Sequence, residues 1–372
     1  MHLGHTVRER LYRALPKPAA RRAGDFDGST GIRRLLVLTK PGNPSFSYYI
    51  EDRLRELAVP AEVRALNARL DDLDPHGTFV ILCRYVKPRQ LLWLRRHRRA
   101  LSGIGLFVDD DIAAMVAAND GPLDYRAYLF GMGILPLPLL NGLLTHLWTS
   151  TEPLAKALAQ DGLTAFVLAP RPRREHYHAI GTRPAMGNAV RMVFHTTGVH
   201  FSEHRFLIPI VAEMLTRHKH LSFEVIAEGA PIRWWNDLAV DPGRLHIRLP
   251  LRWPDYFRET ASKPADIALV PLLPGKTNDR RSDTKRIDVS RMQAAAIYAN
   301  CGIYRRCAMP GEIFADHRPE AWRIEIDRLA TDPFLRQQVR EATIASMAIM
   351  REASQPGFPG LTLHQDGYGH DT

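Results

Sequence analysis

The chain has 372 residues, of which 45% are hydrophobic and 24% are charged. These proportions are typical of globular proteins, and the length is enough for two α/β domains with separate cores. The formal net charge of +10 indicates an anionic partner, such as nucleotide phosphates, nucleic acid or an anionic membrane face. Because no RNA-binding or zinc-finger signature occurs, we expect no nucleic-acid partner.

The sequence contains three cysteines, Cys83, Cys301 and Cys307. Their odd number, and the strand-like runs around the first two, favour reduced thiols over a disulfide framework. A zinc site would need tighter clustering of its ligands. The N-terminus has no apolar signal-peptide core. We therefore expect a cytoplasmic protein.

Residues 1–31 are basic and irregular. One interpretation is a short basic amphipathic arm that touches anionic lipid; the other, which we favour, is a disordered tail. An N-terminal lobe is expected over residues 32–170. Its first strands are expected at residues 33–39, 61–65, 78–83 and 105–108, with helices at 47–57 and 87–99. Strands that alternate with helices predict a mostly parallel sheet.

Residues 128–147 form the most apolar stretch, which is nearly long enough to cross a bilayer. Pro136, Pro138 and Asn141 interrupt it, so we expect buried helix and loop rather than a transmembrane span. Contact with a membrane surface stays open. The rest of this lobe is expected to form strands at residues 147–149 and 165–168 and a helix at 152–160.

A linker is expected at residues 171–188, which are rich in Pro and Arg and poor in core residues. A second lobe follows over residues 189–354, and residues 355–372 have the composition of a flexible tail. The strands of the second lobe are expected at residues 189–195, 221–227, 245–249, 266–272 and 300–304. Its helices are expected at residues 203–218, 254–261, 284–298 and 319–350.

Residues 264–304 carry the clearest chemical signal in the chain. An apolar strand opens through a basic loop onto the start of a helix, where free backbone N–H groups and the helix dipole favour an anion. Lys276, Arg280, Arg281 and Lys285 add full positive charges. The alternative is a solvated basic loop in an ordinary α/β unit.

The second half resembles the C-terminal lobe of GT-B-fold glycosyltransferases of the group 1 or family 4 type, which use nucleotide sugars. The resemblance rests on VRMVFHTTGVHFSEHRFLIPIVAEML, SFEVIAEG, DIALVPL and SDTKRID. In the first half, LFVDDDI and THLWTSTEPLAKAL are similar to elements of the same family. Together the matches span most of residues 104–310. They imply a GT-B-like α/β fold of two Rossmann-like lobes with an interlobe cleft.

The family pattern implies roles on the donor side. Gly198 would let the donor pyrophosphate approach the backbone, Lys285 would neutralise it, and Asp288 would accept hydrogen bonds from the ribose hydroxyls. The predicted donor-binding set is completed by His204, Lys276, Asn278, Arg280 and Ser282. The alternative for Lys285 and Asp288 is a plain surface ion pair.

The predicted catalytic residues are Asp111 and His200. The acceptor-side loop implied by the resemblance comprises Lys40, Gly42, Asn43 and Asp109. Asp109 and Asp111 also match the Asp-x-Asp metal signature of GT-A glycosyltransferases, or an acidic turn that caps the next helix. We prefer a metal-free role, because a second nucleotide-binding half has no place in a GT-A chain. No metal and no cofactor are expected beyond the nucleotide diphosphate sugar, which is a co-substrate.

The chain departs from the family at one point. The family helix usually carries a Glu followed seven residues later by a second Glu, whereas here Asp288 stands at the first place and no second carboxylate follows. The first hypothesis is a metal-independent hexosyltransferase that moves sugar to a glycan, lipid-linked or other acceptor in polysaccharide or glycoconjugate biosynthesis. The second is a non-catalytic nucleotide-sugar-binding protein of a polysaccharide assembly. From the basic surface and the apolar stretch, we also expect the protein to bind peripherally to the inner face of the membrane.

Overall fold

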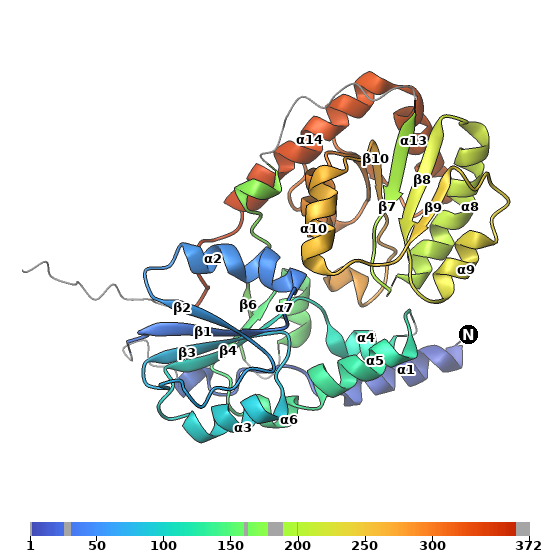
Figure 1. Ribbon diagram of the computed structural model, residues 1–372. Coiled ribbons are helices and arrows are strands. Elements are labelled where there is room, and N and C mark those ends of the chain that lie inside the picture. The colour runs from blue at the N-terminus through green and yellow to red at the C-terminus, as the bar shows by residue number, and fades with distance from the viewer. Residues whose placement is uncertain are drawn as a thin grey trace, which may run out of the picture. The chain divides into compact units, whose positions relative to one another are not determined.

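The computed structural model describes residues 2–25, 31–118, 120–159, 163–177, 189–198 and 200–361, with side chains from residue 6 onward. These residues form two compact units (Figure 1). Unit 1 comprises Met1–Ala118, Asp124–Arg171 and Ser354–Thr372. Unit 2 comprises Asn119–Leu123 and Pro172–Ala353. Much of the predicted linker, residues 178–188, lies outside the described residues.

Unit 1 contains a six-stranded parallel sheet with the strand order β2-β1-β3-β4-β5-β6. Its strands are β1 (Arg34–Thr39), β2 (Ala61–Ala65), β3 (Thr78–Cys83), β4 (Gly103–Val108), β5 (His146–Thr149) and β6 (Phe166–Val167). The runs RLLVLT and TFVILC are buried almost throughout, as expected for parallel strands that helices cover on both faces. The predicted strands of this half are confirmed to within about two residues at each end.

The helices of unit 1 are mostly short. They are α1 (His2–Ala14), η1 (Ala23–Asp25), η2 (Phe46–Ile50), α2 (Glu51–Arg55), α3 (Pro88–His97), α4 (Ile112–Ala117), α5 (Leu123–Leu129), η3 (Phe130–Ile134), α6 (Leu137–Leu140) and α7 (Glu152–Leu158). The predicted helix and loop over residues 128–147 is confirmed, and no helix among the described residues is long and apolar enough to cross a bilayer.

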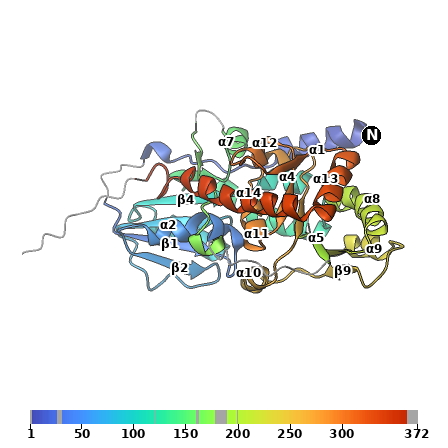
Figure 2. The same ribbon diagram turned by 90° about the horizontal axis from the view of Figure 1, so that it is seen from above.

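The favoured interpretation of the N-terminus, a disordered tail, is wrong for residues 2–14, which form helix α1. The helix is held by its buried Tyr12, whose hydroxyl donates to Asp111 Oδ2 at 3.2 Å, and by the buried Leu15 that follows it. Figures 1 and 2 show α1 beside α4. The charges alone suggested a tail, because the apolar residues that fix the helix are few among many charged ones.

The expected tail is also partly packed. Trp148 Nε1 donates to the carbonyl of Pro359 at 2.8 Å, and the His146 ring bonds the carbonyl of Gly360 at 3.0 Å. Residues 354–361 therefore belong to the core of unit 1, while residues 362–372 lie outside the described residues.

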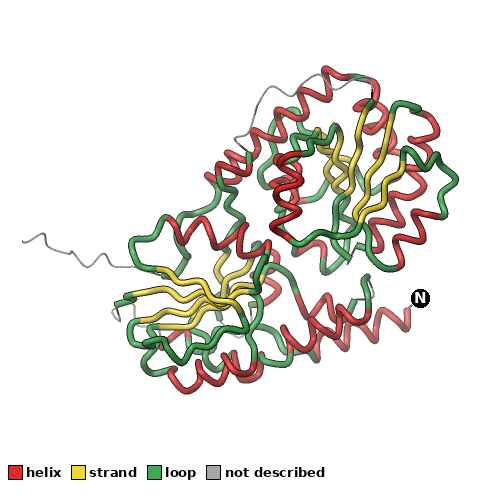
Figure 3. The backbone as a smooth tube through the Cα atoms, in the orientation of Figure 1, coloured by secondary structure: helices red, strands yellow, loops and turns green. Residues whose placement is uncertain are grey.

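Unit 2 contains a second six-stranded parallel sheet, with the order β12-β11-β10-β7-β8-β9. Figure 3 draws the strands of both sheets in yellow among the red helices. Its strands are β7 (Val190–Phe194), β8 (Leu221–Ile226), β9 (Leu245–Arg248), β10 (Ile267–Val270), β11 (Ala295–Ala299) and β12 (Ile313–Ala315). Its helices are η4 (Arg174–His176), α8 (Phe201–Arg217), α9 (Ala230–Asn236), α10 (Trp253–Ser262), η5 (Asn278–Arg280), α11 (Lys285–Arg291), α12 (Gly302–Arg305), α13 (Pro319–Thr331) and α14 (Pro333–Glu352).

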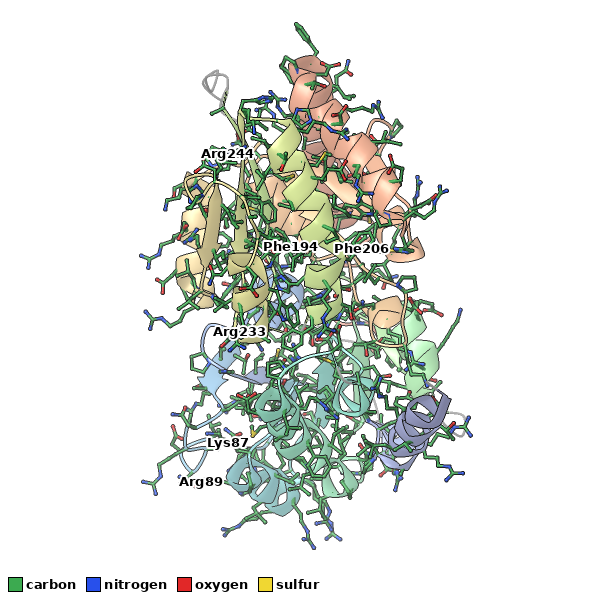
Figure 4. The ribbon with its side chains drawn as sticks, turned by 90° about the vertical axis from the view of Figure 1, so that its right-hand side faces the viewer. Lys87, Arg89, Phe194, Phe206, Arg233 and Arg244 are labelled. Carbon is green, nitrogen blue, oxygen red and sulfur yellow. The ribbon has the colours of Figure 1, made fainter. Side chains whose placement is uncertain are left out.

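The core of unit 2 lies between the sheet and its helices. Phe194 of β7 is buried there, and Phe206 of α8 packs with its ring centroid 5.9 Å from that of Trp322. In Figure 4 both phenylalanines lie among the side chains of unit 2, whereas Lys87 and Arg89 project from the surface of unit 1.

Two predictions in the second half are wrong. The expected helix over residues 284–298 ends at Arg291, and the chain turns at Gln293, whose φ is +53°, into β11. The run AAIYA is fully buried, because its small side chains let helices pack closely on the strand. The expected strand at residues 300–304 is instead helix α12, and the sixth strand is β12.

In each sheet, the order of the strands reverses at one point. In unit 1 the chain adds β2 on one side of β1 and β3 on the other, and in unit 2 it adds β8 and β10 on opposite sides of β7. Open parallel sheets bind ligands beyond the carboxyl ends of the strands at such a point. The turns after β1 and β3, and those after β7 and β10, are therefore the places to look for sites.

Candidate functional site

The turn after β7 carries a buried polar group that has no partner. Thr196 Oγ1 is buried and makes no hydrogen bond to the part of the chain that the structure describes. An unpaired buried hydroxyl is costly, which makes it a natural contact for a ligand atom. Two residues on, a Cβ at Gly198 would lie 3.1 Å from Glu228 Oε2, so a glycine keeps this turn compact. The donor-side prediction for Gly198 falls on this turn.

The loop after β10 is fastened to helix α8 by Glu203. This fully buried carboxylate accepts hydrogen bonds from the Leu273 backbone N–H at 3.2 Å and from Asn278 Nδ2 at 2.7 Å. Burial alone would raise the pKa of Glu203, but bonds and charge from His200 and the backbone N–H donors hold it at about 2. Glu203 therefore stays ionised at neutral pH and fixes the loop beside the β7 turn.

His200 and Arg281 join the same cluster. Arg281 Nη1 lies 2.7 Å from His200 Nε2, and His200 Nδ1 lies 3.4 Å from Glu203 Oε2. Burial, with the Arg281 charge as the next cause, lowers the pKa of His200, so the ring is neutral at pH 7 and accepts a hydrogen bond from Arg281. His200 thus fixes the guanidinium of the basic loop against the turn after β7.

Lys285 is the first residue of helix α11, directly after the basic loop. Its side chain is 32% exposed, and its Nζ lies 3.4 Å from Asp288 Oδ2. Burial is the main cause of the lowered pKa of His195 and of His200, and the Lys285 charge contributes to both. The ammonium group therefore lies within electrostatic reach of both ends of the turn. Lys285 and Arg281 bring two positive charges to one place, as an anion such as a diphosphate requires.

Asp288 is more tightly engaged than predicted. It is buried, and its Oδ1 accepts from Arg291 Nη2 at 2.6 Å. Arg291 Nε in turn donates to Thr260 Oγ1 at 2.7 Å, and its guanidinium lies 4.7 Å from the centre of the Phe257 ring. Asp288 therefore helps to pack α11 on α10, and its predicted contact with ribose stays a prediction.

The remaining donor-side predictions are scattered. Lys276 is exposed in the loop after β10, and Arg280 and Ser282 are half-buried in the same loop. His204 points away from this loop into the interior of unit 2, where its Nδ1 accepts from Trp235 Nε1 at 2.9 Å. The cluster thus gathers Gly198, His200, Asn278 and Lys285, and it leaves His204 in the core.

A second polar cluster lies at the carboxyl ends of β1, β3 and β4 in unit 1. Asp109 Oδ2 accepts from Ser45 Oγ at 2.5 Å, and Arg84 Nη1 lies 3.0 Å from Asp109 Oδ1. Arg84 has a φ of +70°, a strained value for a residue with a side chain. Burial raises the pKa of Asp109, although Arg84 opposes the shift. The predicted Asn43 joins the cluster through its Oδ1, which accepts from the Ser45 N–H at 3.0 Å.

The other acceptor-side predictions have distinct places. Gly42 adopts a φ of +63° in the turn after β1, and Lys40 Nζ lies 5.7 Å from the centre of the Tyr128 ring. Asp111 is buried and caps helix α4, because its Oδ1 accepts from the Ala114 N–H at 2.9 Å. This contact is the capping alternative weighed above, and a catalytic role for Asp111 stays a prediction.

Several residues of the two clusters were not in the predicted sets. They are Ser45, Arg84, His195, Thr196, Glu203 and Arg281. Arg281 could have been included, since it belongs to the basic loop. Glu203 could have been predicted, because it is an acidic residue in the first turn of a helix and follows His200 by three residues. Thr196 has no sequence signal, because only burial without a partner distinguishes it. Within the described ranges, no three His, Cys, Asp or Glu side chains gather in a way that could hold a metal ion.

The buried His204 predicts a pH dependence of stability. Burial, and then the charge of His200, lowers its pKa to about 4, against about 6.5 in an unfolded chain. Between these values the unfolded state binds the proton and the folded state does not. The contribution of His204 to the free energy of unfolding is therefore fully present above pH 6.5 and is lost as the pH drops towards 4, which amounts to about 3 kcal/mol.

Denaturant unfolding at pH 7.5 and at pH 4.5 measures this fall. In His204→Gln, which keeps an acceptor for Trp235, the fall is expected to be smaller by most of that amount. The exposed His246→Gln is the matched control and should behave like the original chain. An equal fall in His204→Gln would show that His204 is not its source.

No family model and no curated protein matches the chain. Solved structures do. The Anabaena Alr3699/HepE structure in complex with UDP and glucose is 10% identical, with a TM-score of 0.54 over 86% of this chain and 98% of its own. A trehalose-6-phosphate synthase solved in a study of glycosyltransfer with retention is 11% identical, with a TM-score of 0.53 over 86% and 96%. TarM is 8% identical, with a TM-score of 0.52 over 77% and 54%. With its two six-stranded parallel sheets flanked by helices, the chain therefore has the two-lobe α/β fold of GT-B proteins.

Proposed function

We propose that the protein is a glycosyltransferase that uses a nucleotide diphosphate sugar. The observation that carries this function is the cluster in unit 2, where Arg281 bonds His200 at one end of a turn that holds the unpartnered Thr196 hydroxyl. The Lys285 charge acts on the histidines at both ends of that turn. The cluster lies where the strand order reverses, the usual ligand position in such a sheet. The fold supports the assignment, because similar structures contain UDP and glucose.

In this function, the donor diphosphate binds between the turn after β7 and the start of α11. Lys285 and Arg281 stabilise the negative charge that develops on the leaving diphosphate, and Thr196 donates a hydrogen bond to it. His200 orients Arg281, and Glu203 holds the loop that carries Asn278. Because two cations of the chain supply the positive charge, we propose that the reaction is metal-independent.

The acceptor side is assigned to the cluster in unit 1. A buried carboxylate with a raised pKa, Asp109, can accept a proton from a sugar hydroxyl, and Arg84 and Ser45 hold it in place. We propose a glycan or lipid-linked acceptor, in keeping with a role in polysaccharide or glycoconjugate biosynthesis.

Thermal unfolding in the presence of UDP, GDP and ADP tests the donor site. At a concentration about 100 times the dissociation constant, a ligand of the folded state adds roughly 2.7 kcal/mol of stability. We expect at least one nucleoside diphosphate to raise the unfolding temperature. The matching nucleosides, which lack the diphosphate, should raise it far less. If no diphosphate changes the unfolding temperature, the donor site is wrong.

One observation favours a second candidate, a non-catalytic nucleotide-sugar-binding protein. Asp288 is engaged by Arg291 and Lys285, and the next carboxylate in the chain, Glu312, is buried against Arg286. Helix α11 therefore offers no free carboxylate to the ribose. Binding of nucleotide sugars without turnover would favour this candidate.

A further inference from the structure

An uncharged and apolar segment of unit 1 lies partly on its surface. Residues 127–151 contain no Asp, Glu, Lys or Arg. Yet Leu135 and Leu139 expose 65% and 58% of their surface, and Phe130 and Tyr128 expose 42% and 38%. Single exposed apolar residues are ordinary, whereas several within twelve residues, without a charge among them, mark an interaction surface.

Helix α1 extends this surface. Its Val7 and Leu11, one turn apart, are exposed while Tyr12 is buried. Both α1 and η3 pack on α4, whose residues are all buried, and Figures 1 and 2 show α1 beside α4. The loop after α1 is tied to the end of α6, because Asn141 Nδ2 donates to the carbonyl of Lys17 at 2.8 Å. The apolar face thus comprises Val7, Leu11, Tyr128, Phe130, Leu135 and Leu139.

Positive charges border the apolar face. The basic fringe comprises the exposed Arg8, Arg10, Arg13 and Arg21. The acid of helix α1, Glu9, is already paired with Arg13 at 3.3 Å. Apolar side chains with arginines at their edge are the composition that binds the head-group region of an anionic bilayer.

We propose that the apolar face and the basic fringe dock unit 1 on a bilayer that contains anionic lipids. Phe130, Leu135 and Leu139 enter the boundary between head groups and acyl chains, and the arginines contact lipid phosphates. The contact lies in the plane of the membrane, since no helix within the described ranges can span it. A second copy of the chain is a poorer partner, because a two-fold interface would set the basic fringe against itself.

This docking surface goes beyond the proposed glycosyl transfer and does not depend on the donor site. A vesicle assay without nucleotide therefore separates the two. If docking fails and nucleotide binding holds, only the membrane contact is wrong.

Flotation of the full chain with vesicles tests the contact. One set of vesicles contains phosphatidylcholine alone, and the other contains phosphatidylcholine and phosphatidylglycerol in equal parts. We expect binding to the second set, weakened by salt. Leu135→Ser/Leu139→Ser, and separately Arg8→Glu/Arg10→Glu, should each lower the partition coefficient by at least about tenfold.

Matched controls come from unit 2. Ile324→Ser/Phe334→Ser replaces side chains that are 50% and 80% exposed, and Arg258→Glu/Arg318→Glu reverses two charges whose side chains are each 78% exposed. Neither control should change vesicle binding, and thermal unfolding verifies that every variant is folded. The contact is overturned if the original chain ignores anionic vesicles or if the controls lose binding equally. It is also overturned if the original chain is a dimer that Leu135→Ser/Leu139→Ser dissociates, with no vesicle binding.

Discussion

Lys285→Ala is expected to abolish the stabilisation by nucleoside diphosphates and to slow glycosyl transfer by a factor of about 10² to 10³. The ammonium group lies within electrostatic reach of His195 and His200 at the two ends of the turn after β7. Its removal takes away one of the two positive charges that stabilise the leaving diphosphate. The fold should barely change, because a partly exposed pair with Asp288 contributes about 1 kcal/mol or less.

The matched control is Lys263→Ala. Lys263 Nζ lies 3.4 Å from Glu259 Oε1, the same separation that joins Lys285 to Asp288, but Lys263 is exposed at the C-terminal end of α10. Its loss should leave the nucleotide response intact. Lys285→Arg should recover part of the response, since it restores the charge in a different shape. If Lys285→Ala is stabilised by nucleoside diphosphates as much as the original chain, the diphosphate does not bind at the start of α11.

Arg286→Met is expected to lower the free energy of unfolding of unit 2 by about 3 to 5 kcal/mol. Arg286 and Glu312 are fully buried and paired with each other, and Arg286 also donates to Ser346 Oγ at 3.1 Å. The guanidinium lies 4.4 Å from the centre of the Tyr298 ring. Removing it leaves the Glu312 carboxylate buried without its cation. Denaturant unfolding measures the loss.

The double change Arg286→Met/Glu312→Leu separates this cause from a simple packing defect. With both charges replaced by apolar groups of similar size, most of the stability should return. The partly exposed pair Arg328–Glu325 provides the comparison, and Arg328→Met should cost only a few tenths of a kcal/mol. If the double variant is as unstable as Arg286→Met, the unpaired carboxylate is not the cause.

Most strands were predictable from the sequence because they are short runs, largely of Leu, Ile, Val and Phe, between turn signals. The same rule failed at β11, whose alanines suit a helix as well as a strand. There the outcome depends on tertiary packing, since β10 on one side and β12 on the other supply the hydrogen bonds of β11. Helix α1 was missed for a related reason, because the buried Tyr12 and Leu15 are few among many charges.

The site was predictable where it depends on local order along the chain. The pattern of a strand, a basic loop and the start of a helix identified Lys285 and Asn278, and this pattern requires no knowledge of which residues lie near them in space. Contacts between distant segments gave no such signal. Glu203 bonds residues about 70 positions away, and Arg84 meets Asp109 across two strands. The engagement of Asp288 by Arg291 was hidden as well, because it depends on how α10 packs on α11.

Release of nucleoside diphosphate from UDP- and GDP-sugars, with an extract of lipid-linked and polysaccharide acceptors, tests the central claim most directly. We expect the purified full chain to release diphosphate from at least one sugar in an acceptor-dependent way, and Lys285→Ala to lose at least about 99% of that rate. Binding of these sugars without release under any acceptor, or equal release by Lys285→Ala, would contradict glycosyl transfer at this site.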